Sequence, residues 1–249
     1  MDVYSRDFSI LEKTDKSPLT EADAAAHLII FEHLTKLTPS LPILSEESVE
    51  EFHGPDSGGC YWLVDPLDGT KEFIKRNGEF TVNIALIARG RPVLGVVYAP
   101  ALGVLYSAAS GLGAFKQRAD GMHEPIRAAE HNTGTPWRVV SSRSHTDNSL
   151  PVFLQRLGAY ELMSIGSSLK LCLIAEGSAD LYPRLGPTSL WDTAAAQCIV
   201  ELAGGGVVKL TGEPLTYDNP FAILNPFFIA HGRSTENWSK MLADVEVTG

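Results

Sequence analysis

The pattern of strands and helices changes once along this chain, and that change constrains the fold more than any other feature. One long helical segment and a run of β-rich segments separated by Gly and Pro turns occupy the first half. From Trp137 onward, strand-like and helix-like segments alternate. Antiparallel strands followed by such alternation predict two layered halves with a cleft between them, with the boundary near residues 120–136.

The individual elements follow from hydrophobic periodicity and from turn residues. In the first half we expect a helix over residues 20–37 and strands over residues 42–44, 60–64, 80–88, 92–98, 103–108 and 113–116. A polar surface segment is expected over residues 119–134. In the second half we expect strands over residues 138–141, 160–164, 180–183 and 227–230, and helices over residues 149–157, 167–176 and 189–203.

Length and charge limit the class of protein. A chain of 249 residues fits one large domain or two closely packed halves. The formal net charge of -10 argues against a protein that binds nucleic acid polymers without sequence preference, because such binding needs a basic surface. It does not exclude a small anionic substrate, since bound cations reverse the local field of an acidic site.

The expected compartment is the cytoplasm. Cys60, Cys172 and Cys198 are widely spaced in apolar stretches, which indicates buried free thiols in a reducing environment. Charged residues among the first ten positions argue against a signal peptide, and no apolar run approaches membrane-spanning length.

The segment over residues 61–72 carries the strongest chemical signal in the chain. Its apolar run stops at Asp65 and Asp68, with Pro66 between them and Gly69 and Thr70 directly after. Two carboxylates at the end of a strand suit Mg²⁺, which prefers oxygen ligands. An ordinary strand-to-helix turn is the alternative interpretation, because Asp, Pro and Gly are common turn residues.

Three further acidic residues lie at the ends of expected elements, where active sites are often built. Glu46 follows a short apolar strand, although an acidic residue in a loop is usually just solvated. Asp23 and Asp192 each lie three positions after a Thr or Ser, a spacing that also matches a capping box at a helix start. Each of the three therefore has a structural interpretation when seen alone.

The spacing of these acidic motifs resembles the inositol monophosphatase superfamily. The matching residues are Glu46-Glu47, then Asp65-Pro66-Leu67-Asp68-Gly69-Thr70, then Trp191-Asp192. The resemblance implies a Mg²⁺-dependent, Li⁺-inhibited phosphomonoesterase. It also implies an α+β or α/β fold of α-β-α-β-α layers, with a mostly antiparallel N-terminal sheet and a mixed C-terminal sheet. The halves are expected over residues 1–130, with the metal motif, and 131–249, with substrate contacts and the last metal ligand.

Further segments narrow the resemblance to the bacterial CysQ group, the 3'(2'),5'-bisphosphate nucleotidases. They are Lys71-Glu72-Phe73-Ile74, Ser142-Arg143-Ser144-His145, Gly166-Ser167-Ser168-Leu169-Lys170 and residues 181–187. This resemblance implies hydrolysis of adenosine 3',5'-bisphosphate (PAP) to AMP and phosphate, with the sulfated analogue PAPS as a second expected substrate, in sulfur assimilation. It leaves open peripheral association with the inner membrane, and either a monomer or a homodimer.

The resemblance also assigns roles to residues. The expected ligands for two or three Mg²⁺ ions are Glu46, Asp65, the carbonyl of Leu67, Asp68 and Asp192. The residues expected to orient and deprotonate the attacking water are Thr70, with Asp23 behind it, and Glu46. The expected substrate contacts are Gly69, Thr70, His145, Gly166, Ser168, Lys170, Arg184 and Asp192.

The chemistry of the substrate adds one argument from the residues themselves. A bisphosphate carries a second phosphate that is not cleaved, and that group needs a cation or a helix N-terminus. Lys170 and Arg184 are the candidates, although Lys170 alone also fits a helix lysine whose ammonium reaches solvent, and His145 fits a loop histidine. No residues of the sequence identify an adenine pocket.

Two alternative functions stay open at this point. Within the same class, the enzyme would be an inositol monophosphatase or a sugar-bisphosphatase, which kinetics with competing substrates would separate. In a different class, the chain would be a non-catalytic, metal-dependent nucleotide-binding protein. The presence of both Thr70 and Asp23 counts against that second alternative, because a binding protein does not need to activate water.

Overall fold

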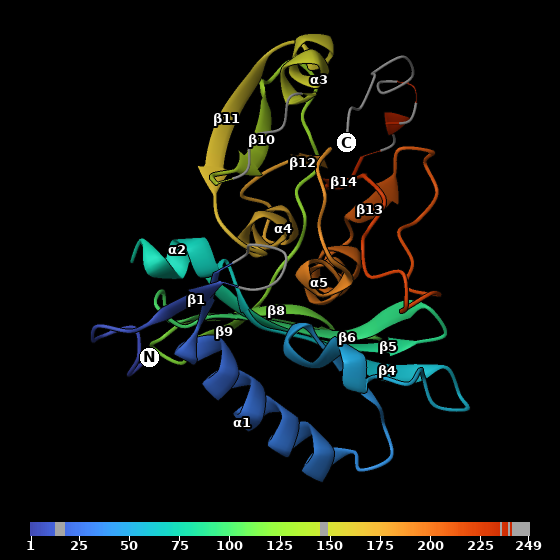
Figure 1. The fold of residues 1–249 in the computed structure, drawn as a ribbon. Coiled ribbons are helices and arrows are strands. Elements are labelled where there is room, and N and C mark those ends of the chain that lie inside the picture. Colours follow the sequence, from blue (N-terminus) through green and yellow to red (C-terminus); the bar gives the residue numbers. More distant parts are fainter. Residues whose placement is uncertain (13–17, 145–148, 235, 239, 241–249) are drawn as a thin grey trace.

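The computed structural model describes residues 1–12, 18–144, 149–234, 236–238 and 240. Within this part of the chain the strands form a seven-stranded sheet, a five-stranded sheet and a two-stranded ribbon of β1 (Ile10–Glu12) and β2 (Pro18–Thr20). Figure 1 shows α1 (Glu21–Leu37) on the outer face of the larger sheet and α4 (Leu169–Ala175) with α5 (Ala194–Leu202) between the sheets. Helix α3 (Leu150–Leu157) packs on the far face of the smaller sheet. The expected α-β-α-β-α layering is confirmed.

The seven-stranded sheet follows the order of the sequence. Its strands are β3 (Ile43–Ser45), β4 (Cys60–Asp68), β5 (Thr81–Ala88), β6 (Arg91–Ala99), β7 (Val104–Ala109), β8 (Gly113–Gln117) and β9 (His123–Pro125). β3 and β4 are parallel, and the other pairs are antiparallel. Arg89 and Gly90, which join β5 to β6, both have positive φ, as a two-residue type I′ hairpin requires. Short turns of this kind explain the predominantly antiparallel sheet.

The five-stranded sheet is mixed and has the order β11-β10-β12-β14-β13. Its strands are β10 (Trp137–Ser142), β11 (Tyr160–Ile165), β12 (Leu181–Arg184), β13 (Gly206–Lys209) and β14 (Phe228–His231). β10 is parallel to both β11 and β12, and the connections run through α3 on one face and α4 on the other. Ligands of such sheets bind outside the carboxyl ends of parallel strands, at the point where the connections change face. That edge carries Ser142, Ile165 and Arg184.

The hydrophobic core lies mainly between the two sheets. Helices α4 and α5 supply fully buried residues such as Ile174 and Ile199, which belong to one cluster with Leu63 and Ile87 of the larger sheet. A second cluster joins α3 to the smaller sheet, and a third joins α1 to the outer face of the larger one. Burial alternates strictly along β5, because one face of that strand packs toward α5 and the other toward α1.

Several sequence expectations about elements were wrong in detail. The single helix over residues 189–203 is instead a 3₁₀ turn, η2 (Leu190–Asp192), followed by α5, with non-helical backbone at Thr193. The hydroxyl of Thr193 donates to the carbonyl of Leu190 at 3.1 Å, which holds the break. Strand β4 extends to Asp68 rather than ending at residue 64, and β9 lies within the segment expected to be irregular. Elements missed altogether are β1, β2, η1 (Glu46–Glu51), α2 (Thr70–Ile74) and β13.

The cysteines are free thiols, as expected. Burial is confirmed for Cys172 and Cys198, whereas Cys60 is half-buried. Among the described residues, no helix combines the length and the apolar character that crossing a bilayer requires. The division into halves at residue 130 stays a prediction; the larger sheet ends at Pro125 and the smaller sheet begins at Trp137.

Candidate metal and phosphate site

The site is a pocket with a volume of about 350 Å³ that both sheets line. Asp65 and Asp68 of the lining come from the seven-stranded sheet and Arg184 from the five-stranded sheet, while Lys71 and Lys170 come from the helices after Gly69 and Ser168. The lining includes the following predicted site residues: Glu46, Asp65, Leu67, Asp68, Gly69, Thr70, Gly166, Lys170, Arg184 and Asp192. Asp23 and Ser168 lie behind the pocket wall, and His145 lies outside the described residues.

Strand register explains why Glu46 and Asp65 share the pocket. β3 and β4 are parallel, and Ser45 pairs with Val64, so the acidic residues that follow, Glu46 directly after β3 and Asp65 on β4, lie near each other. The register of β4 against β5 then shifts between Asp65 and Asp68. Such a bulge re-aims side chains at the end of a strand. The two aspartates therefore both line the pocket although they are three residues apart.

Three carboxylates form the centre of the acidic cluster. Oxygens of Asp65, Asp68 and Asp192 lie within 4.8 Å of one another. Burial raises the pKa of Asp65 well above its usual range, and the charges of Glu46, Asp68 and Asp192 raise it further. Burial, followed by the charge of Asp68, raises the pKa of Asp192 to about 8. Crowded, all-oxygen donors of this kind, of which Asp65 is buried and Asp68 and Asp192 are half-buried, fit a hard divalent cation, which would relieve the repulsion.

Donors from β5 and from the start of α4 fix the orientation of Asp68. Its Oδ2 accepts hydrogen bonds from the backbone N–H of Ser168 at 2.6 Å and from the Ser168 hydroxyl at 2.8 Å. The Asn83 amide and the Thr81 hydroxyl donate to the same oxygen at 3.2 and 3.3 Å. Because these donors occupy Oδ2, a cation would bind through Oδ1. The sequence analysis missed Asn83 and Thr81, although both lie on β5, directly beside the motif strand.

Capping boxes are present at both Asp23 and Asp192, and neither prevents a role in the site. Oδ2 of Asp192 accepts from the backbone N–H of Ser189 at 2.8 Å, while the side chain also belongs to the acidic cluster. Oδ2 of Asp23 accepts from the N–H and the hydroxyl of Thr20, at 2.8 and 2.6 Å. Its Oδ1 accepts from the hydroxyl of Thr70 at 3.3 Å. Each carboxylate caps a helical turn. Asp192 also lines the pocket, and Asp23 contacts Thr70, which lines it.

Thr70 begins α2 at the floor of the pocket. Its hydroxyl lies 3.3 Å from Oδ1 of Asp23 and 3.4 Å from the carbonyl of Leu67. Burial raises the pKa of Asp23, which is 2% exposed. Gly69, directly before Thr70, has a φ of 91°, a conformation that favours glycine. The three predicted residues Asp23, Leu67 and Thr70 are therefore in contact.

Lys170 and Arg184 form the cationic end of the pocket. Each is only 7% exposed, so Lys170 is not a helix lysine that reaches solvent. The Lys170 ammonium donates to the carbonyl of Ser167 at 2.5 Å, and burial lowers its pKa to about 8. Nη2 of Arg184 donates to the carbonyl of Pro187, but its buried Nε has no partner within the described part of the chain. An unpaired buried donor in a pocket indicates an anionic ligand.

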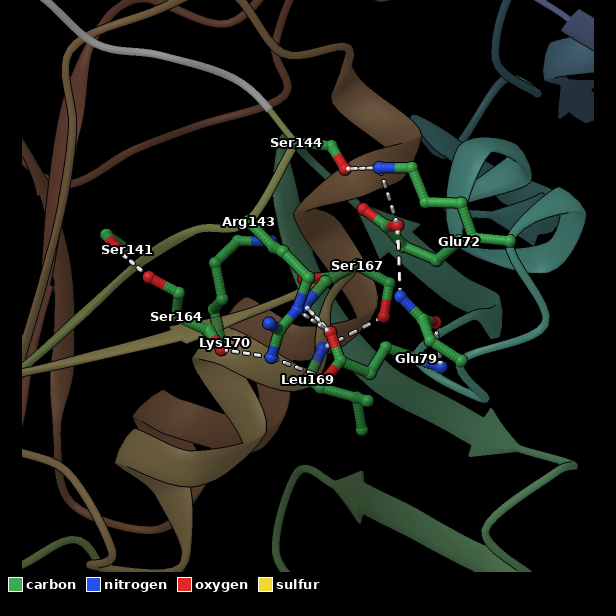
Figure 2. Close-up of polar contacts among 12 residues, drawn as sticks. Glu72, Glu79, Ser141, Arg143, Ser144, Ser164, Ser167, Leu169 and Lys170 are labelled. Carbon is green, nitrogen blue, oxygen red and sulfur yellow. Dashed lines mark hydrogen bonds and ion pairs between the residues drawn. The ribbon is translucent and has the colours of Figure 1, made fainter.

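Other basic residues near the pocket mouth are committed to protein groups. Arg143 forms a bidentate ion pair with Glu79, and Lys75 donates to Ser144 (Figure 2). Arg76 donates to the carbonyls of Tyr4 and Arg6. Lys71 also lines the pocket but is exposed, so the buried positive charge of the lining comes from Lys170 and Arg184.

The structure gives the two serines of the Gly166–Ser167–Ser168 loop different places. Ser167 lines the pocket, whereas Ser168 is 1% exposed. The hydroxyl of Ser168 lies 2.8 Å from Oδ2 of Asp68 and 2.7 Å from the carbonyl of Asp192. Ser168 thus joins two expected metal ligands, and its predicted contact with substrate stays a prediction.

Curated relatives resemble the chain over most of its length. A protein of Escherichia coli named 3'(2'),5'-bisphosphate nucleotidase CysQ is 51% identical over 230 residues, which cover 92% of each chain. The protein of the same name from Salmonella typhimurium is 53% identical over the same shares.

Solved structures and a family model agree with this similarity. CysQ from Bacteroides thetaiotaomicron superposes with a TM-score of 0.76 at 40% identity, covering 94% of this chain and 91% of that one. An IMPase from Thermotoga maritima gives a TM-score of 0.78 at 29% identity, covering 97% and 90%. The model of the inositol monophosphatase family matches residues 1–244. This chain belongs to the inositol monophosphatase family.

Proposed function

We propose that this protein is a Mg²⁺-dependent 3'(2'),5'-bisphosphate nucleotidase that hydrolyses PAP to AMP and phosphate. The observation that carries the proposal is the composition of a single pocket. It brings a cluster of three carboxylates together with two buried cations, Lys170 and Arg184. A cation-binding end for the cleaved phosphate and a cationic end for the uncleaved one suit a bisphosphate. The names of the curated relatives support the same substrate class.

The donor set fits magnesium. The residues proposed to hold two or three Mg²⁺ ions are Glu46, Asp65, Asp68, Asp192 and the carbonyl of Leu67, all of which offer oxygen. When bound, the ions would neutralise the phosphate charge, acidify water and align the attacking and leaving oxygens. Both aspartates with raised pKa values, Asp65 and Asp192, would be ionised by bound cations.

Thr70 and Asp23 would prepare the attacking water. The Thr70 hydroxyl accepts a hydrogen bond from water while it donates its own proton to Oδ1 of Asp23. That chain of contacts gives the proton from water a path toward a buried carboxylate whose pKa is raised, as a general base requires. Water then displaces the 3'-oxygen from phosphorus, that oxygen takes up a proton from solvent to become the 3'-hydroxyl, and AMP and phosphate are released.

Lys170 and Arg184 would hold the 5'-phosphate. The Nε of Arg184 supplies a donor that lacks a partner among the described residues, and Lys170 supplies charge. Charge-assisted hydrogen bonds of this kind are about twice as strong as neutral ones. A substrate without a second phosphate would lose these contacts, so the cationic end favours bisphosphates over inositol monophosphate.

A phosphate-release panel tests the proposal. PAP, PAPS, inositol 1-phosphate and fructose 1,6-bisphosphate are compared at equal concentration, with and without Mg²⁺. We expect the highest kcat/KM for PAP and release only with Mg²⁺. Inositol 1-phosphate or the sugar bisphosphate hydrolysed as fast as PAP would instead support the alternative activities. Binding of AMP without any hydrolysis would support the non-catalytic alternative.

The remaining parts of the proposal follow from the family. They are hydrolysis of PAPS, inhibition by Li⁺, a cytoplasmic role in sulfur assimilation, and a monomeric or homodimeric state. Substrate contacts by Gly69, His145, Gly166 and Ser168 belong to the same proposal, and co-crystallisation with AMP would test them.

A further inference from the structure

Glu79 lies between two loops that contain glycine, one at Gly69 before α2 and one at Gly166 before α4. It lies in the connection from α2 to β5, on the side of the seven-stranded sheet. A Cβ built on Gly69 would lie 3.2 Å from the carbonyl oxygen of Glu79. A Cβ built on Gly166 would lie 2.7 Å from that oxygen and 3.1 Å from Cβ of Glu79. Gly166 leaves no room for a side chain because Glu79 and Cγ of Glu72, also at 2.7 Å, pack against it, whereas Gly69 is favoured mainly by its φ of 91°.

The carboxylate of Glu79 holds the five-stranded half by three hydrogen bonds (Figure 2). Oε2 accepts from the backbone N–H of Gly166 at 2.8 Å and from Nε of Arg143 at 2.7 Å. Oε1 accepts from Nη2 of Arg143 at 2.8 Å, and the same Nη2 donates to the carbonyl of Ser164 at 2.6 Å. Glu79 thus fixes the end of β11 directly and through Arg143.

The loop that follows has a carboxylate at each end. Glu79 accepts from the N–H of Gly166, and Asp68 accepts from the N–H of Ser168 at 2.6 Å. Ser167, between them, has a φ of 49°, which a non-glycine residue adopts only when its surroundings enforce it. Its carbonyl accepts from the ammonium of Lys170. The position of that ammonium therefore depends on two acidic residues of the other sheet.

We infer that Glu79 is a positioning residue for the cationic end of the pocket. It sets the Gly166–Ser168 loop, and through the Ser167 carbonyl it sets the ammonium of Lys170. The inference rests on the proposed function in that it assigns the cationic end to the uncleaved phosphate. The inference goes beyond that function because recognition of the uncleaved phosphate would depend on Glu79, which belongs to the half with the metal motif.

The test compares Glu79→Ala, Glu79→Gln and Arg143→Ala with a matched control. The control is Glu124→Ala, which removes the acidic partner of Arg118 from an exposed pair on the same sheet. Calorimetry of the full-length protein gives the Kd for AMP, the product that keeps the 5'-phosphate. Steady-state kinetics with PAP gives KM and kcat separately.

We expect Glu79→Ala to raise the Kd for AMP and the KM for PAP by about tenfold or more, because a buried N–H and a guanidinium lose their acceptor. We expect kcat to change by less than about threefold, because the carboxylate of Glu79 accepts from Gly166 and Arg143 and not from the residues proposed to activate water. Glu79→Gln keeps an acceptor for Gly166 and should recover most of the affinity for AMP. Arg143→Ala should give a smaller loss than Glu79→Ala, and Glu124→Ala should change nothing.

The outcomes separate this inference from the proposed function. Wild-type protein that binds AMP but releases no phosphate from PAP would end the proposed function, and the order of AMP affinities would still test Glu79. Equal AMP affinity in Glu79→Ala and wild type would overturn the inference, as would wild-type protein that binds no AMP. If Glu79→Ala does not fold, wild-type AMP affinity in Arg143→Ala would overturn it instead.

Discussion

The acidic and the cationic ends of the pocket are held in place by different kinds of structure. Glu46, Asp65 and Asp68 lie on or directly after two neighbouring strands, and backbone register places them. Lys170 lies on the seven-residue helix α4, which follows a loop with a positive φ at Ser167. The carboxylates of Glu79 and Asp68, from the other half, hold that loop. Backbone pairing places Glu46, Asp65 and Asp68 on one half, and Ser168 of the other half then orients Asp68, whereas Lys170 depends mainly on contacts between the halves. We therefore expect mutations to affect the two ends in different ways.

The largest expected effect concerns the acidic end. Asp65→Asn should lower kcat for PAP by roughly a thousandfold or more, because a metal ligand that supports several kcal/mol of catalysis is lost. The fold should survive, since the neutral amide relieves repulsion from Asp68 and Asp192. Phosphate release and circular dichroism measure the two effects. Asp120→Asn, on an exposed loop, is the control; turnover equal to wild type in Asp65→Asn would remove this pocket from the mechanism.

The second effect concerns the contact between Thr70 and Asp23. Thr70→Ala should lower kcat by about a hundredfold with little change in KM, because the proton path is lost while both ends of the pocket persist. Thr70→Ser keeps the hydroxyl and should recover most of the activity. Steady-state kinetics at saturating Mg²⁺ provides the measurement. A change confined to KM would contradict a role in activating water.

The third effect concerns the cationic end. Lys170→Met should raise the KM for PAP about tenfold to a hundredfold, since a charge-assisted hydrogen bond contributes roughly 1.5–3 kcal/mol. We expect a much smaller change in kcat than Asp65→Asn produces. Lys36→Met, on the exposed surface of α1, serves as control. Equal losses in kcat and KM would show that the two ends do not act separately.

The fourth effect is a pH dependence of binding at the same end. Burial lowers the pKa of Lys170 to about 8, while Asp68, Asp192 and Glu72 raise it and Arg184 lowers it. Because only the protonated ammonium attracts phosphate, the Kd for AMP should rise as pH increases above about 8. Lys170→Met should lose this dependence. A wild-type Kd that stays constant from pH 7 to pH 9.5 would contradict it.

The smallest effect is on stability without metal. Burial and mutual repulsion raise the folded-state pKa of Asp65 and Asp192, the latter to about 8. The folded state then holds protons that the unfolded state has released, so stability falls as pH rises from about 4 toward about 8. Thermal melts with EDTA should show this fall, and Mg²⁺ should reverse it. Asp65→Asn should weaken the trend; melting temperatures that rise over this pH range would contradict it.

Asp23 and Asp192 show what a local sequence pattern can and cannot predict about the role of a residue. A capping box and a place in the site looked like competing interpretations for Asp23 and Asp192. The structure shows that one oxygen of each carboxylate serves the cap, while Oδ1 of Asp23 meets Thr70 and Asp192 joins the acidic cluster. A carboxylate has two oxygens with separate partners, so a sequence pattern that explains one of them does not exclude a second role.

The sequence by itself determined the change from β-rich to alternating segments, the two layered halves and the acidic motif. Periodicity and turn residues depend on a few neighbouring positions. Asp65, Asp68 and Thr70 could be predicted from the sequence because they lie in one short segment. Only the tertiary structure decided that Asn83 and Thr81 orient Asp68, that Ser168 joins Asp68 to Asp192, and that Glu79 holds Gly166. These partners lie up to 100 residues apart along the chain. Their meeting depends on how the two sheets pack, and no local pattern encodes that packing.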